Sequence, residues 1–224
     1  MFPGKIDPFP IRYLGIPLGL RKLGKTELQP LVDKVANRLP IWKANLLNRA
    51  GRTVLIKNTL SAIPTHTALA VNLSPWVIKC IDGYRRGFLW QGASTAKGGH
   101  CLLSWPRVCR PTDFGGLGLL DLQRFGYALR MRWLWLKRAE GNRSWQDLPT
   151  KEEPIVQAMF QESIYFELGD GNMALFWSDR WLQGQSLLDV APCLCNAVDT
   201  RVRKRRTVAH ALQNNCWISD ISGR

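Results

Sequence analysis

The stretch from Leu102 to Glu140 constrains the fold most, because it joins an extended segment, a glycine-rich elbow and a long helix. The elbow, Phe114-Gly-Gly-Leu-Gly-Leu, needs glycine because a tight reversal into a helix uses backbone angles that a β-carbon resists. Asp121 stands just before the periodic run and is the predicted N-cap. Apolar residues then recur at helical intervals and share one face: Leu122, Phe125, Leu129, Trp133 and Leu136.

Three further amphipathic helices are predicted before residue 92. The first follows Thr26-Glu-Leu-Gln, which has the form of a capping box, and stops at Pro40. The second begins after Asn48 and ends before Pro64, with apolar residues on more than one side, as is typical of a well-buried helix. The third begins at Ser74-Pro75, an N-cap followed by proline at the first helical position.

The second half of the chain contains a predicted β-hairpin. Ile164-Tyr-Phe-Glu-Leu and Met173-Ala-Leu-Phe-Trp favour strands, and Gly169-Asp-Gly-Asn between them supplies the turn. Tyr13-Leu-Gly-Ile-Pro-Leu is a second short extended piece, limited to a sheet edge by Pro17. The predicted fold class is therefore mainly α with short β-hairpins (α+β). A helical domain is followed, after about residue 140, by a small mixed α/β segment.

The net charge of +14 is distributed unevenly. Residues 1–112 hold 17 Lys and Arg against 4 Asp and Glu, whereas residues 113–224 hold 14 against 13. Such asymmetry favours a polyanionic partner for the first half, most simply nucleic acid, although a solvated basic surface is the alternative. Residues 151–200 contain 2 basic and 8 acidic side chains, which disfavours contact with phosphates there.

Cations on the predicted outer helix faces are the candidate phosphate contacts, because sequence-independent binding needs charge and no base-specific group. The full set is Lys34, Arg38, Arg49, Arg52, Lys57, Lys79, Arg86, Arg124, Arg130, Arg132 and Lys137. The basic run Arg201-Val-Arg-Lys-Arg-Arg is of a kind used for nuclear import or nucleic-acid contact, and a solvated linker is an equal alternative.

Six sequence motifs resemble the C-terminal part of plant LINE-type (non-LTR) retrotransposon reverse transcriptases, and they occur in that family's order. Three lie in the central stretch: Trp105-Pro-Arg-Val-Cys-Arg-Pro, Gly115-Gly-Leu-Gly-Leu and Ala128-Leu-Arg-Met-Arg-Trp-Leu-Trp. The others are Arg12-Tyr-Leu-Gly-Ile-Pro-Leu-Gly, Leu46-Leu-Asn-Arg-Ala-Gly-Arg-Thr-Val-Leu-Ile-Lys, and Gly169-Asp-Gly-Asn followed by Phe176-Trp-Ser-Asp-Arg-Trp-Leu. The resemblance covers most of the chain.

The resemblance implies a division into four parts. Residues 1–20 would be a remnant of the exit from the catalytic palm, 21–140 a helical thumb-like domain, 141–200 a β-hairpin and aromatic linker, and 201–224 the basic run and the truncated start of the zinc-binding-domain region. A polymerase needs clustered carboxylates for two metal ions. The family's Asp-Asp pair lies upstream of anything matched, and this sequence has no adjacent Asp-Asp. We therefore expect template-primer binding without catalysis.

Several other sites are disfavoured by the sequence. Cys193, Cys195, His210 and Cys216 lack the second ligand pair of a structural zinc site, and the family's zinc module would begin beyond Arg224. No cofactor or small-molecule substrate is indicated, and no apolar run approaches the ~20 residues of a membrane span. A decayed element without function remains an alternative.

A protein-interaction module is the other alternative. Its anchor surface would consist of exposed tryptophans: Trp133, Trp135, Trp145, Trp177 and Trp181. Asp179, which stands among these tryptophans beside Arg180, is predicted to be a structural hydrogen-bond or ion-pair group and not a catalytic one.

Overall fold

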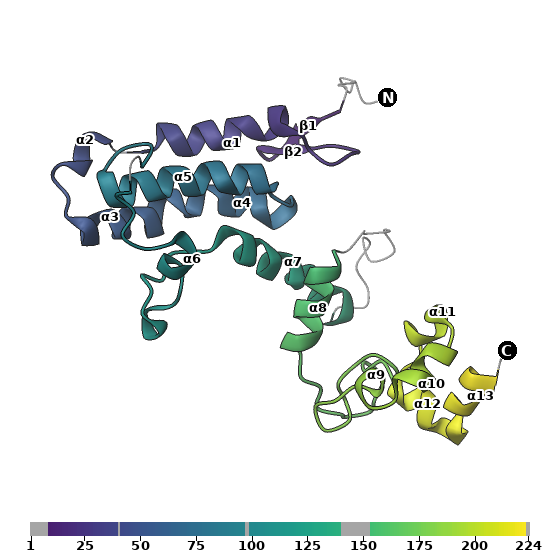
Figure 1. The fold of residues 1–224 in the computed structure, drawn as a ribbon. Helices are drawn as coiled ribbons and strands as arrows, with labels where there is room; N and C mark the ends of the chain where they lie inside the picture. The colour runs from purple at the N-terminus through teal and green to yellow at the C-terminus, as the bar shows by residue number, and fades with distance from the viewer. Residues whose placement is uncertain (1–8, 40, 97–98, 140–152, 223–224) are drawn as a thin grey trace, which may run out of the picture. The chain divides into compact units, whose positions relative to one another are not determined.

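A computed structural model describes residues 9–39, 41–96, 99–139 and 153–222 (Figure 1). The predicted end of the first helix at Pro40 and the predicted anchor Trp145 lie outside these residues. The elements, in chain order, are β1 (Ile11–Tyr13), β2 (Ile16–Leu18), α1 (Lys25–Asn37), α2 (Ile41–Ala44), α3 (Arg49–Leu55), the π-helical turn η1 (Ile56–Leu60), α4 (Ala62–Ala70), α5 (Pro75–Gln91), α6 (Trp105–Val108), the 3₁₀ turn η2 (Thr112–Phe114), α7 (Leu122–Ala139), α8 (Pro154–Ser163), α9 (Leu187–Val190), α10 (Pro192–Ala197), α11 (Thr200–Arg203), α12 (Val208–Leu212), the 3₁₀ turn η3 (Gln213–Asn215) and α13 (Trp217–Ser222).

The predicted fold class, mainly α with short β-hairpins, is confirmed. The chain divides into two compact units, unit 1 (Met1–Arg130) and unit 2 (Met131–Arg224). In unit 1, β1 pairs with β2 as an antiparallel hairpin. Its two-residue turn is Leu14-Gly15, with φ of 51° and 79°, because a tight hairpin turn needs positive φ at both central residues.

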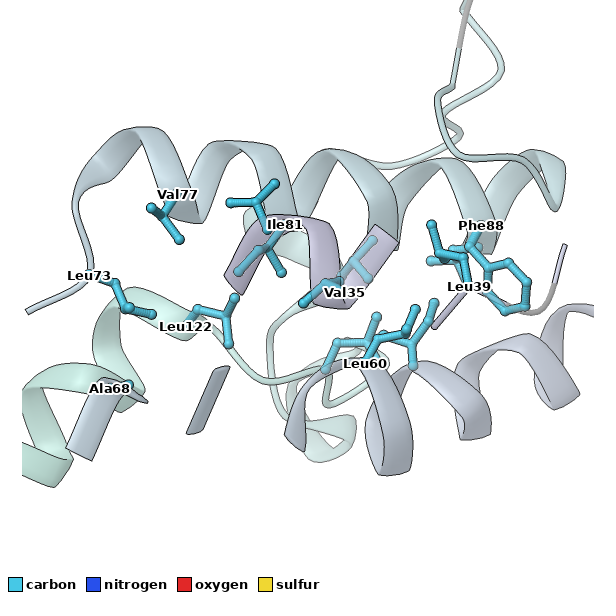
Figure 2. Close-up of a cluster of buried hydrophobic side chains, with 14 of the residues drawn as sticks. Val35, Leu39, Leu60, Ala68, Leu73, Val77, Ile81, Phe88 and Leu122 are labelled. Atoms are coloured by element: carbon cyan, nitrogen blue, oxygen red, sulfur yellow. The ribbon is translucent and has the colours of Figure 1, made fainter. Parts of the chain in front are cut away.

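The core of unit 1 is built from the apolar faces of α1, η1, α4 and α5, and α1 lies alongside α5 (Figure 1). Leu28, Val32 and Val35 of α1 are buried, as their spacing predicts. Figure 2 shows Val35 and Leu60 in the same cluster as Ile81 of α5. This packing turns the remaining sides of α1 and α5 outward, where Lys34 of α1 and Lys79 of α5 are exposed.

Three of the four predicted helix starts are confirmed and one is wrong. The Asn48 side chain accepts from the Gly51 amide at the start of α3, at 2.9 Å. The Ser74 hydroxyl accepts from the Val77 amide at the start of α5, and the Asp121 carboxylate accepts from the amides of the two residues that follow Leu122. The capping box at Thr26 does not form, because α1 already begins at Lys25 with Gly24 as its N-cap, and the Thr26 hydroxyl donates to the neighbouring side chain of Glu27.

The second predicted helix does not end before Pro64. The chain stays helical from Arg49 to Ala70, with the π-turn η1 between α3 and α4. The Ser61 amide donates to the Ile56 carbonyl, five residues back, at 2.9 Å. A new run of helical hydrogen bonds begins after this widened turn, so Pro64 falls in the first turn of α4. Proline is tolerated there because the N–H groups of a helix's first turn have no partner within the helix.

The glycine-rich elbow closes tightly on itself. The Leu117 amide donates to the Val108 carbonyl at 3.0 Å, and the Gly118 amide donates to the Arg110 carbonyl at 2.8 Å. A β-carbon on Gly116 would lie 2.0 Å from the Arg110 carbonyl oxygen, so no other residue fits there without backbone movement. The predicted elbow is therefore present, and it delivers the chain to the start of α7.

The β-hairpin predicted for residues 164–177 is wrong. The Gly169-Asp-Gly-Asn turn does form, with the Asp170 carboxylate accepting from the Asn172 amide at 3.1 Å, but the flanking segments do not pair. The partner of the second segment is residues 206–209 instead. The Phe176 amide donates to the Arg206 carbonyl, and two amides of residues 208–209 donate back to residues 171–174. A distant segment thus replaces the local strand.

Candidate nucleic-acid interface

Most of the predicted phosphate-contact residues have exposed side chains. These are Lys34, Arg38, Arg49, Lys57, Lys79, Arg124, Arg132 and Lys137, whereas Arg52, Arg86 and Arg130 are half-buried. All of them except Arg132 and Lys137 belong to unit 1. The structure therefore presents charge on several elements of unit 1, and the surroundings of each cation decide whether it can reach a ligand.

Lys34 and Arg38 lie one helical turn apart at the C-terminal end of α1, away from its buried residues. Lys79 stands on α5 on the side opposite Val77 and Ile81, both of which are fully buried. Among the described residues, none of these three cations pairs with a carboxylate. Their charges are thus available to solvent or to a polyanion.

Two cations of α3 are engaged within unit 1. The Arg52 guanidinium donates from Nε and Nη2 to the Ala44 carbonyl at 3.3 and 2.9 Å, which ties α2 to α3. The Arg49 guanidinium lies 5.7 Å from the centre of the Trp90 ring. Lys57, on η1, is exposed. Arg52 thus serves as a structural tie, while Arg49 and Lys57 keep exposed charge.

The Arg86 side chain of α5 packs against the protein and does not extend into solvent. Its guanidinium lies 5.9 Å from the centre of the Trp105 ring, and its Nε is buried without a hydrogen-bond partner. Helical spacing placed Arg86 on the outer face of α5, but α6 carries Trp105 over that face. The charge of Arg86 can still act electrostatically, although its donor geometry is constrained.

Sequence reasoning missed Arg85, the largest fully buried side chain in the chain as described. Its Nη1 donates to Asp82 Oδ1 at 2.7 Å, and its Nη2 donates to the Leu120 carbonyl at 2.7 Å. The guanidinium also lies 5.2 Å from the centre of the Trp105 ring. Arg85 therefore fastens the middle of α5 to the end of the elbow, and it sets where α7 begins.

Burial controls the ionisation of the groups around Arg85. Removal from water raises the pKa of the Asp82 carboxyl, and the Arg85 charge and hydrogen bond oppose that rise. Burial also raises the pKa of the Cys109 thiol to about 11. This thiol is therefore protonated at neutral pH, which makes it a poor nucleophile and a poor metal ligand. The cluster of Arg85, Asp82 and Cys109 therefore has a structural role.

The cations of α7 differ in their surroundings. Arg124 makes only a loose contact with Asp121, at 3.6 Å, and its side chain is 84% exposed. The Arg130 guanidinium lies 5.3 Å from the centre of the Tyr127 ring on the same helix. Trp133 and Trp135 are 42% and 56% exposed. The helix thus carries both exposed charge and exposed aromatic surface.

In unit 2 the prediction that Asp179 is structural is confirmed, but its partner is not Arg180. The buried Asp179 carboxylate accepts two hydrogen bonds from Arg138, at 2.8 and 2.9 Å, and one from the Leu175 amide at 2.7 Å. Arg180 pairs with Glu162 instead. Three donors satisfy the buried charge, as a structural carboxylate requires.

The tryptophan anchor surface does not exist as predicted. Trp177 is 2% exposed, and Trp181 stacks on Phe176 with their ring centres 5.4 Å apart. Trp177 also donates from its indole nitrogen to Asp220 at 3.2 Å. These rings form the core of unit 2 together with residues of α10 and α12. Among the predicted anchors that the structure describes, Trp133 and Trp135 are exposed, Trp181 is half-buried and Trp177 is buried.

The basic run 201–206 is folded and is not a solvated linker. Its first residues belong to α11, and Arg206 pairs with Asp220. Arg201, Lys204 and Arg205 are exposed. The run therefore carries three exposed cations on unit 2, which supply a useful comparison for the cations of unit 1.

Within residues 9–39, 41–96, 99–139 and 153–222, no three His, Cys, Asp or Glu side chains are grouped so that they could hold a metal ion. In the same part of the chain, no helix has the length and apolar character that crossing a membrane requires.

Comparison with known proteins gives one informative similarity. A "Putative ribonuclease H protein" of Arabidopsis thaliana is 25% identical over 200 residues, which cover 78% of this chain and 32% of that protein. The chain thus spans about a third of the length of this curated relative. No protein-family model and no solved structure matches the chain.

Proposed function

We propose that the chain is a nucleic-acid-binding fragment of a retrotransposon-encoded protein, the thumb-like region of a LINE-type reverse transcriptase. It would hold an RNA–DNA duplex by its phosphate backbone and contribute no catalytic group. The sequence motifs and the similarity to a longer plant protein with a ribonuclease H name support this origin. The helical unit 1 is compatible with a thumb, which packs against itself and turns charge outward.

The observation that carries the proposal is uncompensated positive charge on unit 1. Residues 1–112 contain only four acidic residues against 17 basic ones, and one of the four, Asp82, already pairs with the buried Arg85. Lys34, Arg38 and Lys79 are exposed without a carboxylate partner among the described residues. Electrostatics of this kind binds phosphates without reading sequence.

The test is fluorescence anisotropy with a labelled RNA–DNA duplex, titrated from about 50 to 200 mM salt. The variant carries Lys34→Gln, Arg38→Gln and Lys79→Gln. If each cation neutralises one phosphate, the slope of log K against log salt should become less negative by about 3, since each contact contributes roughly 0.9 on a B-form duplex.

The matched control removes the same charge from unit 2, through Arg201→Gln, Lys204→Gln and Arg205→Gln. All three cations are exposed, so neither set of substitutions disturbs a core. The control should change the slope little. Equal losses from both triple variants would show that net charge alone drives binding and would contradict an interface on unit 1. Absence of binding by the folded protein at low salt would refute the proposal.

A further inference from the structure

A small cavity of about 140 Å³ opens in unit 1 between the start of α5 and the first turns of α7. This volume is well below the ~300 Å³ at which pockets for drug-sized ligands begin. One small ring with its substituents is the size of group that fits.

One wall of the cavity is a preorganised polar face of α7. Gln123, Tyr127 and Arg130 line it and recur at helical spacing. Gln123 Nε2 donates to the Tyr127 hydroxyl at 2.8 Å, and the Arg130 guanidinium lies 5.3 Å from the centre of the Tyr127 ring. The Gln123 side-chain carbonyl accepts no hydrogen bond from the described residues, so it can receive one from a ligand.

The opposite wall is apolar and belongs to the start of α5. Leu73, Pro75 and Ile78 line it, and Leu122 closes the side next to α7. Lys22 and Asn72 complete the polar part of the lining, and none of the described residues that line the cavity is a carboxylate. The cavity therefore combines a flat aromatic and guanidinium surface, amide groups and two cations with an apolar wall.

These groups match the chemistry of an unpaired nucleotide. Unpaired bases are recognised by stacking on aromatic rings or guanidinium planes and by amide hydrogen bonds to their polar edges, while cations hold the phosphate. A base pair is too large for this space, and its edges are already engaged in pairing. We propose that the cavity takes the base of one unpaired nucleotide at the end of a nucleic-acid strand, with its phosphate held by Lys22 and Arg130. This inference rests on the proposed function only in taking a nucleic acid as the ligand.

Gly126 offers a direct way to block the cavity, because it lines it from α7. A β-carbon at Gly126 would meet only Arg130 Nη1, at 3.4 Å, so the helix tolerates a side chain there and the added bulk enters the cavity. The blocking variant is Gly126→Leu. Gly83→Leu on α5 is the matched control, because a β-carbon at Gly83 meets nothing within 4 Å. A second test variant, Gln123→Ala, removes an exposed side chain and cannot disturb the core.

The first experiment compares a blunt RNA–DNA duplex with the same duplex carrying one unpaired 3′ nucleotide, by anisotropy. The unpaired nucleotide should tighten binding by about fivefold or more in the parent protein, the usual effect of stacking one base. Gly126→Leu and Gln123→Ala should lose this gain while keeping their affinity for the blunt duplex, and Gly83→Leu should retain it. In a protein that binds the blunt duplex, the inference is overturned if the gain is absent or if it survives in Gln123→Ala and in a folded Gly126→Leu.

The second experiment separates this inference from the proposed function. Uridine 5′-monophosphate is titrated into ¹⁵N-labelled protein, and the backbone amide shifts of Gln123, Gly126 and Tyr127 are followed. Shifts confined to these amides in a protein that ignores duplexes would support the cavity as a nucleotide site and refute duplex binding. A protein in which neither the free nucleotide nor the unpaired strand end has any effect refutes the cavity as a nucleotide site.

Discussion

Replacing Arg85 with methionine should destabilise unit 1 far more than removing any exposed arginine. The Arg85 side chain is fully buried, and it donates to Asp82 and to the Leu120 carbonyl, each at 2.7 Å. Methionine keeps much of the apolar volume beside Trp105 but provides no donor. The largely buried Asp82 carboxylate and the Leu120 carbonyl would then both lose the guanidinium as their partner. Breaking a buried pair in this way costs about 3–5 kcal/mol.

The chain contains a matched pair for comparison. Arg124 and Asp121 have the same order and the same three-residue spacing as Arg85 and Asp82, but their contact is 3.6 Å long and the side chains are 84% and 36% exposed. Solvent screens such a pair, so Arg124→Met should cost only about 0–0.5 kcal/mol. The difference between the two substitutions isolates the effect of burial from the effect of charge pairing.

The pH dependence supplies an independent check of the Arg85 reasoning. Burial already raises the pKa of Asp82, and Arg85 is the main opposing influence. In Arg85→Met that pKa should rise further. An acid whose pKa is higher in the folded than in the unfolded state contributes stability at low pH and loses it as the pH rises through the folded pKa. The gap between variant and parent should therefore narrow from pH 7 to pH 5.

Urea unfolding, followed by circular dichroism and tryptophan fluorescence, measures these free energies at both pH values. Adding Asp82→Asn to Arg85→Met should recover part of the loss at pH 7, because an amide carries no charge to bury. The reasoning fails if Arg85→Met and Arg124→Met cost the same, or if the gap between Arg85→Met and the parent widens toward pH 5.

Two further predictions concern the elbow and Cys109, which precedes it in the chain. Gly116→Ala should destabilise unit 1 by about 3 kcal/mol or more, since its β-carbon would lie 2.0 Å from the Arg110 carbonyl oxygen. Gly115→Ala should cost about 1–2 kcal/mol, because Gly115 has a φ of 74° but open space around it. Thermal unfolding of both variants tests this prediction, which fails if Gly115→Ala lowers the stability as much as Gly116→Ala. The Cys109 thiol, with its pKa of about 11, should resist iodoacetamide at pH 8 while the exposed Cys193 reacts. Mass spectrometry of the partly alkylated protein measures this difference, and equal labelling of the two cysteines would contradict the prediction.

Local chemistry explains which parts of the fold could be predicted. Ser74-Pro75 and Asp121 mark helix starts through hydrogen bonds within three residues, and the structure confirms both. The predicted hairpin at residues 164–177 is absent because the Phe176 amide donates to the carbonyl of Arg206, thirty residues further along the chain. A strand-like composition indicates only that a segment favours extended pairing, and the segment it pairs with is not always the nearest one in the sequence.

The candidate interface was predictable where exposure follows from helical spacing. Lys34 and Lys79 lie away from the apolar faces of their helices and are exposed. The contacts of Arg52 and Arg86 come from other elements, so spacing alone could not find them. Arg85 did leave a signal, because it falls four residues after Ile81 and therefore on the apolar face of α5. A basic residue at such a position predicts a buried ion pair.

The π-turn η1 has a consequence for how sequences of this kind should be aligned. A residue inserted into a helix rotates everything after it by ~100°, so the one extra residue between Leu55 and Ser61 sets which side of α4 is buried. The same extra residue lets Pro64 stand early in a fresh helix. Relatives that replace this proline are then free to carry a one-residue gap at η1, whereas relatives that keep it should keep the full length of the turn. An alignment should therefore place a gap at η1 only in relatives that lack this proline.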